Sequence, residues 1–282
     1  MGVAHITDRI ASVTLPTILL ILIFLTIARA GLVASRVSLF RSTADLLESA
    51  ILAIALVFLL LRPFVVQSFY IPSGSMHPTL WAGDRILVNK FVYRMHPPRH
   101  GDIVVFRAPA KADPEEKDFI KRVVGLPGDV IEIKAGYVAV GKGRDEYIYT
   151  PDAVYSHLCT LNSVEGGDLP RLSLMTDTIW IGDRRITPEE FAQKVSRPGA
   201  PVRIHPGKVV RNGQVLHEYY VREDAHYHMD PATVPPGHLF VMGDNRNESR
   251  DSHVWGTFPA DRIVGRADFV FWPIRNAKRI HN

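Results

Sequence analysis

The sequence predicts a mostly β domain of antiparallel strands that is interrupted by an inserted subdomain and preceded by two transmembrane helices. Two long apolar runs lie near the N-terminus, short alternating stretches separated by turn signals fill most of the remainder, and one segment differs in texture. The predicted parts are an N-terminal tail (1–9), a first transmembrane helix (10–28), a cytoplasmic loop (29–48), a second transmembrane helix (49–68), the first part of the β domain (69–141), the insertion (142–200) and the second part of the β domain (201–282).

Composition restricts the classes of protein that fit. The chain has 282 residues, 46% hydrophobic and 22% charged, so it can bury a core and is neither disordered nor collagenous. Its 33 Lys and Arg residues against 29 Asp and Glu give a net charge of +4 without a dense basic block. Nucleic acid is therefore not expected as a partner. The single cysteine, Cys159, excludes an intramolecular disulfide and a cysteine-rich metal site.

The first apolar run covers residues 10–28 without a charge. At about 1.5 Å per residue, a helix of that length spans roughly 28 Å of hydrocarbon. The alternatives are a cleavable signal peptide or a buried helix. A signal peptide normally begins with a basic region, whereas only Asp8 and Arg9 precede this run, and a second apolar run follows. The sequence therefore favours a membrane span.

The second apolar run begins near Ser49 and continues to Ser68, interrupted by Arg62 and Pro63. It crosses a membrane only if Arg62 extends toward the head groups, as long basic side chains near helix ends do. This span is predicted less strongly than the first.

Basic residues predict the orientation of the two spans. Arg29, Arg36 and Arg41 lie between the runs, and arginines of a short loop favour the cytoplasmic side. The loop is therefore expected in the cytoplasm and both termini outside it. Arg62, at the far end of the second run, argues against this orientation but is outnumbered.

Beyond residue 70 the pattern changes to short apolar strands bounded by Gly and Pro turns, with no long helical period among them. These features predict a mostly antiparallel β domain. The expected strands include 85–88, 102–106, 120–124, 129–133, 238–242 and 267–271.

The stretch 142–200 differs in residue pattern from the rest of the β domain, because it contains Pro151, Pro170 and a pair of glycines. It also contains Thr187-Pro-Glu-Glu190, a pattern typical of the start of a helix. We interpret this stretch as an inserted subdomain.

The segment 71–80, Ile-Pro-Ser-Gly-Ser-Met-His-Pro-Thr-Leu, holds two serines on an irregular backbone. A serine on such a turn can direct its hydroxyl and its own N–H toward one point, as an acyl-transfer nucleophile requires. Ser75 follows Ser68 by seven positions, and an extended chain covers at most about 3.6 Å per residue, so Ser75 is expected near the bilayer surface. The alternative is an ordinary juxtamembrane loop.

The predicted strand around 119–125 carries two adjacent cations on opposite faces, Lys121 and Arg122. One of them is expected to point inward. A lysine surrounded by apolar side chains has a lowered pKa, and its neutral amine can accept the proton of a serine hydroxyl. The alternative is that both side chains extend to water.

The polar loop 242–256 directly follows an apolar strand, so it is either solvated or functional. It lacks the spacing of a calcium loop, because Arg246 stands where an oxygen ligand is needed. His226 and His228 flank one residue, but no third zinc ligand lies nearby in the sequence. A metal site is therefore not expected.

Five ordered motifs resemble those of the bacterial type I signal peptidases. The resemblance covers 71–129 and resumes over about 207–273, and the two N-terminal spans fit the same family. The motifs are Pro72-Ser-Gly-Ser-Met-His-Pro-Thr-Leu80, Gly83-Asp-Arg-Ile-Leu-Val-Asn-Lys90, Gly101-Asp-Ile-Val-Val-Phe106, Ile120-Lys-Arg-Val-Val-Gly-Leu-Pro-Gly-Asp129 and Gly243-Asp-Asn-Arg246 with Asp251-Ser252.

The resemblance implies a serine endopeptidase that removes signal peptides from exported preproteins after Ala-x-Ala-like sites. Ser75 is then the nucleophile and Lys121 the general base. The N–H of Ser75 and the hydroxyl of Ser73 form the oxyanion hole, and Ser249 orients the lysine. The positions that support the site are Met76, Arg122, Asp244, Arg246 and Asp251.

The same resemblance implies the protein's surroundings. Its partners are the signal peptides of membrane-inserted preproteins and the lipid bilayer, with no nucleic acid, metal or cofactor. The expected location is the bacterial cytoplasmic membrane, crossed more than once, with the catalytic domain on the periplasmic side.

The sequence departs from the family in two places. His253 stands where the family commonly has an arginine that pairs with the aspartate matching Asp251, so this support is expected to be weaker or pH-dependent. The stretch 142–200 has no counterpart, and its lone Cys159 cannot form the disulfide found in some members.

Two other functions fit parts of the sequence. One is a self-cleaving Ser/Lys regulator of the repressor type, although such proteins are soluble and need no membrane spans. The other is an anchored binding module whose β domain lacks catalysis, although it retains Ser75 and Lys121.

Overall fold

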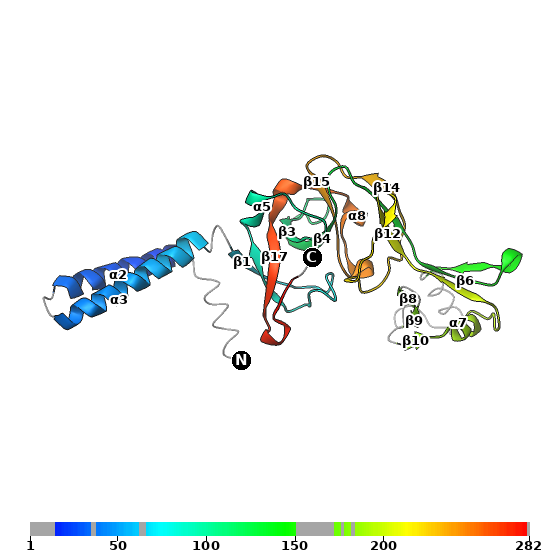
Figure 1. Cartoon of the computed structure of the whole chain (residues 1–282), viewed down its shortest axis with the longest axis horizontal. Coiled ribbons are helices and arrows are strands. Elements are labelled where there is room, and N and C mark those ends of the chain that lie inside the picture. The colour runs from blue at the N-terminus through cyan, green and yellow to red at the C-terminus, as the bar shows by residue number, and fades with distance from the viewer. Residues whose placement is uncertain are drawn as a thin grey trace. The chain divides into compact units, whose positions relative to one another are not determined.

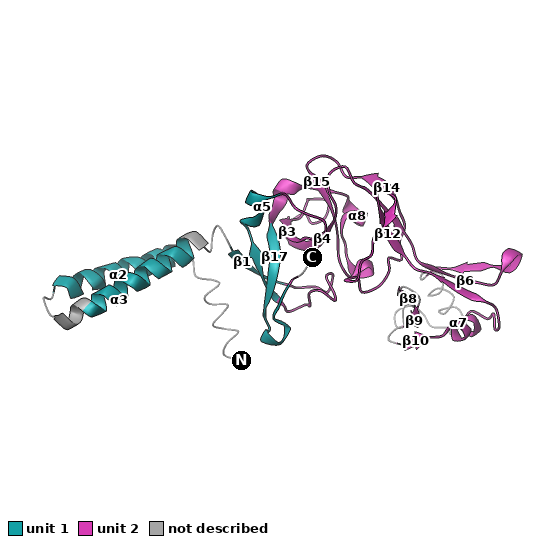
Figure 2. Cartoon of the chain, viewed as in Figure 1, with its two compact units in different colours: residues 1–70, 85–96, 265–279 teal, residues 71–84, 97–264, 280–282 magenta. Residues whose placement is uncertain are grey.

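The computed structural model describes residues 15–34, 38–61, 66–150, 172–175, 178–181 and 184–280. The predicted N-terminal tail, the Arg62–Pro63 interruption and Cys159 lie outside these residues. The chain divides into two compact units (Figure 2). One comprises residues 1–70, 85–96 and 265–279, and the other 71–84, 97–264 and 280–282.

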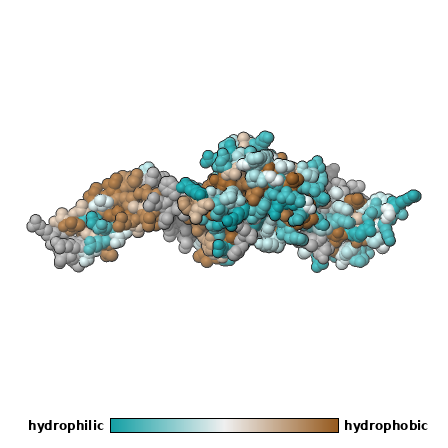
Figure 3. All heavy atoms as spheres, turned by 45° about the horizontal axis from the view of Figure 1, so that its top comes forward, coloured by the Kyte–Doolittle hydropathy of each residue, from teal (hydrophilic) through white to brown (hydrophobic). Residues whose placement is uncertain are grey.

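The first unit contains two apolar helices that lie side by side (Figure 1). They are α2 (Leu15–Ala34) and α3 (Ser38–Ala55), and a π-helical turn η1 (Leu56–Leu61) continues α3. Both are long and apolar enough to cross a membrane by length and composition, and little of their surface is buried. Hydrophobic side chains make up most of the visible surface of these helices (Figure 3). Apolar surface of this extent requires an apolar partner.

The helices extend into the segment expected as a loop. The structure continues α2 to Ala34 and begins α3 at Ser38, so most of the predicted loop 29–48 is helical. The intervening arginine, serine, alanine and glutamate residues are compatible with a helix, and an ion pair between Arg29 and Glu48 joins the two helices. The two helices thus extend into the polar segment, and the cytoplasmic loop stays a prediction.

The strands of the first unit are antiparallel. They are β1 (Val66–Tyr70), β2 (Arg85–Asn89), β17 (Ile263–Trp272) and β18 (Lys278–Arg279), accompanied by the short helices α5 (Val92–Met95) and η5 (Ile274–Asn276). Strand β1 includes residues 66–68, which were expected at the end of the second transmembrane helix. These residues pair with β2 instead, with Val66 opposite Asn89, because this sequence favours an extended chain.

The second unit contains the antiparallel strands that carry the predicted site. They are β3 (Ile103–Arg107), β4 (Asp118–Gly125), β15 (His238–Met242) and β16 (Phe258–Pro259), with β4 between β3 and β15. Phe106 of β3 stacks on Phe258 of β16 with ring centroids 4.1 Å apart, and Trp255 packs at their edge. These buried rings form an aromatic cluster that packs β3 against β16.

A second sheet of this unit has the order β13 (Gln214–Val215), β12 (Lys208–Arg211), β5 (Val130–Lys134) and β14 (Met229–Thr233). Asn212 and Gly213 join β12 to β13 with positive φ angles of 53° and 80°. Two residues in this conformation form the tight turn that suits the twist of a hairpin, and asparagine followed by glycine adopts it most readily.

The described residues in and around the insertion form two three-stranded sheets and a helix. The first sheet has the order β11 (Val202–His205), β6 (Tyr137–Val140) and β7 (Tyr147–Tyr149), and the second β10 (Arg184–Ile186), β9 (Thr178–Ile181) and β8 (Leu172–Met175). The 3₁₀ turn η2 (Gly143–Asp145) precedes β7. Helix α7 (Pro188–Lys194) begins with a complete capping box between Thr187 and Glu190, as the sequence predicts.

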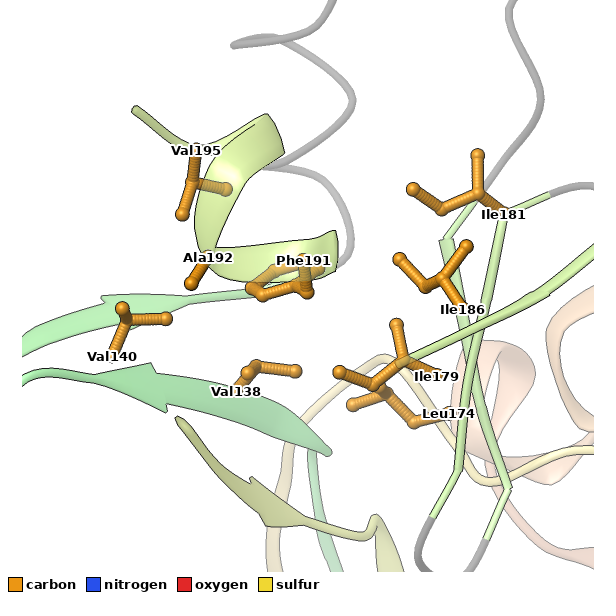
Figure 4. Packing of buried hydrophobic residues seen from close by; sticks show 9 residues of the cluster. All are labelled: Val138, Val140, Leu174, Ile179, Ile181, Ile186, Phe191, Ala192 and Val195. Atoms are coloured by element: carbon orange, nitrogen blue, oxygen red, sulfur yellow. The ribbon is translucent and has the colours of Figure 1, made fainter. Parts of the chain in front are cut away.

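Nine buried hydrophobic residues hold this region together (Figure 4). Two of them, Val138 and Val140, belong to β6, which lies outside the predicted insertion 142–200. The small core is therefore shared with the strand that precedes it, and those boundaries stay a prediction. The cluster consists of Val138, Val140, Leu174, Ile179, Ile181, Ile186, Phe191, Ala192 and Val195.

The predicted class of fold is confirmed. The two apolar helices are followed by mostly antiparallel β structure, and each of the six strands expected from alternation is present in β2, β3, β4, β5, β15 or β17. The remaining short elements are the 3₁₀ turns η3 (Arg246–Glu248) and η4 (Ala260–Arg262) and the helix α8 (Ser252–Trp255).

Asp129 joins the turn after β4 to the β12–β13 hairpin. Its carboxylate accepts hydrogen bonds from the Leu126 N–H at 2.8 Å and from Asn212 Nδ2 at 2.7 Å, and it lies 2.6 Å from His100 Nε2. Burial raises the pKa of Asp129, but the hydrogen bonds from His100, Leu126 and Asn212 outweigh it and lower the pKa below the ordinary 3.8. The carboxylate therefore stabilises the fold at neutral pH, and this stabilisation is lost as the pH falls through and below 3.8.

We expect Asp129→Asn to lower the free energy of unfolding by about 1–3 kcal/mol at pH 7, because its three neighbours His100, Leu126 and Asn212 lose a charged partner. The difference in the free energy of unfolding between Asp129→Asn and the wild type should decrease as the pH falls toward 3, because Asp129 itself then becomes neutral. Thermal unfolding of the detergent-solubilised chain across this range measures it, with the exposed Asp261→Asn as the control. A difference that stays constant with pH would contradict a role for the charge.

Candidate active site

Ser75 lies on a turn that its own backbone hydrogen bonds hold. The His77 N–H donates to the Gly74 carbonyl at 3.0 Å, and the Leu80 N–H donates to the Met76 carbonyl at 2.9 Å. Met76 is completely buried, as the side chain beneath the turn, and Ser75 is only 9% exposed. The sequence folds locally in this way because Pro72 and Pro78 restrict the backbone on either side.

Strand β4 brings Lys121 to Ser75. The Lys121 Nζ lies 2.9 Å from Ser75 Oγ and 3.0 Å from the Ile120 carbonyl oxygen, and the lysine is 5% exposed. Of the two adjacent cations on the strand, Lys121 points to the serine, whereas Arg122 points to Asp244. The alternative in which both side chains extend to water is therefore wrong.

The surroundings of Lys121 control its protonation. Burial disfavours the charged ammonium and lowers the pKa of Lys121 to about 8, although the carboxylates of Asp251 and Asp244 act in the opposite direction. The buried amine can thus lose its proton near neutral pH. A nucleophile and a base at hydrogen-bond distance, both shielded from water, can perform acyl transfer.

Arg122 and Asp244 form a buried ion pair next to the dyad. The guanidinium donates to both carboxylate oxygens at 2.8 and 2.7 Å, and both side chains are 1% exposed. Arg122 also donates to the Gly101 carbonyl at 2.9 Å and lies over the Tyr220 ring at 3.7 Å. Thr79, from the serine segment, donates to Asp244. The pair therefore connects β4, the polar loop and the serine segment.

A second buried ion pair supports the polar loop. Arg246 donates to the two carboxylate oxygens of Glu218 at 2.7 and 2.6 Å, and to the Gly243 carbonyl at 3.1 Å. The Tyr220 hydroxyl donates to the same glutamate at 2.8 Å, and burial raises the pKa of Tyr220, so the hydroxyl keeps its proton. Bidentate contacts of this kind hold a loop in one orientation.

Asp251 anchors the end of β15. Its completely buried carboxylate accepts from the Gly243 N–H at 2.8 Å and lies 2.6 Å from His253 Nδ1. The His253 ring stacks on Tyr227 with centroids 3.8 Å apart. The histidine thus retains the contact with Asp251 that the resemblance assigns to an arginine.

Gly243 explains how closely Ser249 approaches the dyad. A Cβ at position 243 would collide with Ser249 Oγ and with the Ser75 carbonyl oxygen, so only glycine fits there. Among the described residues, the buried Ser249 Oγ has no hydrogen-bond partner. Ser249 therefore lies beside the serine turn, without the hydrogen bond to Lys121 that an orienting role requires.

The structure brings most of the predicted site residues together. Lys121 contacts Ser75, Arg122 pairs with Asp244, Arg246 and Asp251 both bond to the Gly243 backbone, and all six side chains are buried, as is Met76. Ser73 precedes the nucleophile on the same turn and is exposed, and no hydrogen bond of its side chain is present in the described part of the chain. The same region of the structure holds no group of three or more His, Cys, Asp or Glu side chains arranged for a metal ion.

Sequence reasoning missed four residues of the site: Thr79, Glu218, Tyr220 and Asn245. Glu218 and Tyr220 lie within the range 207–273 that resembles the family, but the resemblance assigns them no role, and their contacts with Arg246 and Arg122 appear only in the fold. Asn245 lies within the polar loop and acts on backbone atoms, which leave no pattern in the sequence.

Comparison with known proteins identifies related sequences. The family model described as signal peptidase, peptidase S26, matches residues 43–157 and 193–272. The unmatched stretch between these ranges lies inside the segment predicted as an insertion.

Individual relatives carry the same description. A probable signal peptidase I from Synechocystis is 35% identical over 79% of this chain and 80% of its own. Signal peptidase I from Aquifex aeolicus is 31% identical over 78% of this chain and 80% of its own. A crystal structure of a signal peptidase I from Enterococcus faecalis is 21% identical, covers 60% of this chain and 95% of its own, and has a TM-score of 0.23. Family membership rests on the sequence matches.

We expect Asp244→Ala to lower the free energy of unfolding by about 3–5 kcal/mol, because it leaves the Arg122 guanidinium buried without a counter-charge. The double variant Arg122→Met, Asp244→Leu should recover most of this loss, since both charges are then absent. Chemical denaturation of the detergent-solubilised variants measures both values.

The control is the exposed ion pair between Lys117 and Glu115, where Glu115→Ala should change stability by less than about 1 kcal/mol. A double variant as unstable as Asp244→Ala would show that the loss comes from packing and not from an unpaired charge.

Proposed function

The chain belongs to the signal peptidase family, peptidase S26, and on this premise we propose that it cleaves signal peptides from exported preproteins by a Ser/Lys dyad. The proposal depends chiefly on the 2.9 Å contact between Lys121 Nζ and Ser75 Oγ in a site shielded from water. The scissile bond follows small residues in an Ala-x-Ala-like pattern, as the family resemblance implies.

The first step forms an ester. The neutral Lys121 amine accepts the proton of the Ser75 hydroxyl while Oγ attacks the carbonyl carbon of the scissile peptide. The resulting oxyanion is stabilised by the Ser75 N–H and the Ser73 hydroxyl. The C–N bond then breaks, the lysine ammonium returns its proton to the leaving amine, and the signal peptide stays attached to Ser75 as an ester.

The second step releases the signal peptide. Lys121, neutral again, accepts a proton from a water molecule that attacks the ester carbonyl. Collapse of the second tetrahedral intermediate breaks the C–O bond, and the proton passes from Lys121 to Ser75 Oγ. The enzyme returns to its starting state, and no metal or cofactor takes part.

The lowered pKa makes lysine an effective base. With a pKa of about 8, roughly a tenth of the lysine is neutral at pH 7. An ordinary lysine with a pKa of 10.5 would be neutral about 300-fold less often. Asp251 and Asp244 raise this pKa, but each already faces a basic group, Asp244 with Arg122 and Asp251 with His253. We infer that these pairings limit how far the two carboxylates hold the proton on Lys121.

The two apolar helices anchor the enzyme in the bacterial cytoplasmic membrane, with the catalytic domain on the periplasmic side. Their length and composition support the anchor, and the arginines at positions 29, 36 and 41 support the orientation. The substrates are then signal peptides of preproteins inserted in the same bilayer. Tethering enzyme and substrate to one membrane raises their effective concentration.

We expect the wild type to process a preprotein with an Ala-x-Ala site in detergent, and Ser75→Ala and Lys121→Ala to lose about 10³-fold or more of the rate, because each removes one half of the dyad. The measurement is single-turnover cleavage followed by gel electrophoresis. Lys117→Ala, at an exposed lysine just before the same strand, is the matched control and should retain full activity.

Normal cleavage by Lys121→Ala would contradict the dyad. If no folded variant, including the wild type, processed the substrate or reacted at Ser75 with a serine-acylating inhibitor, the inert binding module would be the better interpretation. Autoproteolysis as the sole activity would favour the self-cleaving regulator.

We expect kcat/KM to rise about tenfold per pH unit below pH 7 and to level off above about pH 8, because only the neutral amine of Lys121 accepts the proton. Asp251→Asn removes the largest charge that holds the proton on the lysine, so it should shift the midpoint to lower pH. Steady-state rates between pH 6 and 11 test both statements. A midpoint near 10.5 would show an unperturbed lysine.

A further inference from the structure

Asn245 holds the backbone on both sides of the nucleophile. Its own N–H donates to the Ser75 carbonyl oxygen at 3.1 Å, and its side-chain Nδ2 donates to the Gly74 carbonyl oxygen at 3.1 Å. We propose that Asn245 is a positioning residue that aims the Ser75 N–H at the oxyanion of the tetrahedral intermediate. This inference rests on the proposed function, because it concerns the same acyl-transfer step.

The covalent geometry of one peptide unit carries the argument. The Gly74 carbonyl and the Ser75 N–H belong to the same trans peptide unit. They therefore point in opposite directions within one rigid peptide plane. A hydrogen bond that fixes the carbonyl oxygen therefore fixes the direction of the N–H. Gly74 has no side chain to restrict rotation of this peptide plane, so the orientation of the plane depends on hydrogen bonds from other residues.

Two donors meet at the Gly74 carbonyl oxygen. Besides Asn245 Nδ2, the His77 N–H donates to it at 3.0 Å. Hydrogen bonds accepted by a carbonyl polarise the peptide and make its N–H a stronger donor. Within the described residues the Ser75 N–H donates to no protein acceptor, so this strengthened donor is available to the substrate.

The amide of Asn245 can adopt only one orientation. Its second Nδ2 proton meets Glu248 Oε2 at 2.9 Å, so both protons face acceptor oxygens. Rotating the amide by half a turn would place Oδ1 against the Gly74 carbonyl and the Glu248 carboxylate, with a repulsive contact at each. Glu248, an exposed residue, thereby selects the amide orientation that reaches the serine turn.

The backbone of Asn245 is held firmly enough to act as a reference point. Its two neighbours in the chain are Asp244, paired with Arg122, and Arg246, paired with Glu218. Both pairs are buried and bidentate, and Asn245 itself is 1% exposed. The two ion pairs thus fix the position of Asn245, which in turn fixes the backbone around Ser75.

The decisive variant is Asn245→Asp, which keeps the shape of the side chain and removes its donor to the Gly74 carbonyl. We expect kcat to fall about 10- to 100-fold with KM changed less than about twofold, since loss of an oxyanion donor itself costs about 10²–10³-fold. A peptide boronate that forms a tetrahedral adduct with Ser75 should lose affinity by the same factor as kcat/KM. Binding of the intact substrate to the Ser75→Ala background should be unchanged by Asn245→Asp.

Three controls separate the lost donor from other effects. Asn247→Asp makes the same substitution two residues further along, where the amide contacts His226 and Asp224, and should leave kcat unchanged. Glu248→Gln retains an oxygen acceptor for Asn245 Nδ2 and is the reference for the other variants at this position. The double variant Asn245→Asp, Glu248→Gln relieves the repulsion between two carboxylates but restores no donor to Gly74, so its kcat should stay low.

Folding of each variant is checked by thermal unfolding. If the Asn245 variants do not fold, Glu248→Ala decides, because it frees the amide to rotate and should lower kcat about two- to fivefold relative to Glu248→Gln. Normal kcat and boronate affinity in a folded Asn245→Asp enzyme, or equal losses in boronate affinity and in binding of intact substrate, would overturn the inference. A wild type that neither cleaves nor forms the adduct would instead refute the proposed function.

Discussion

Burial of one amine is the constraint on which the rest of the site depends. Lys121 lies 2.9 Å from Ser75 Oγ with almost no access to water, and this desolvation lowers its pKa to about 8. Loss of hydration makes the ammonium form of Lys121 less favourable than it is in water. Yet the polar loop places two carboxylates nearby, which favour the charged form. The architecture around the dyad reconciles these opposing effects.

Each of the two carboxylates has a partner other than Lys121. Arg122 occupies both oxygens of Asp244, and the His253 ring contacts one oxygen of Asp251. The same pairs hold β4, β15 and the serine turn against one another. One set of contacts thus serves the electrostatics of the lysine and the geometry of the serine. Removing either member of a buried pair disturbs both, and a stability change alone does not reveal which of the two matters for catalysis.

Much of the fold and part of the site follow from the sequence. Alternating apolar residues predict the strands, and the Thr187–Glu190 pattern predicts the start of α7, because these signals are local. Ser75 and Lys121 lie far apart in sequence. Their residue types alone therefore indicated two candidates, and only the family resemblance implied that the two side chains act together. Helix ends near Ala34 and Ser38 were missed because polar residues compatible with a helix resemble a loop. The hydrogen bonds from Asn245 to the Gly74 and Ser75 carbonyl oxygens were not predicted, because the positions of backbone atoms depend on the complete fold.

The sheet that borders the insertion region has a consequence for how this protein tolerates change. Strands β6 and β11 run antiparallel with Val140 opposite Val202, and the Gly141 N–H donates to the Pro201 carbonyl oxygen at 2.8 Å. The chain therefore leaves and re-enters at neighbouring points, about 5 Å apart in an antiparallel ladder. Closing a loop across such a gap costs only about 0.6 kcal/mol more for each doubling of its length. Segments of very different size can consequently occupy this position in the course of evolution without straining the strands that carry the dyad.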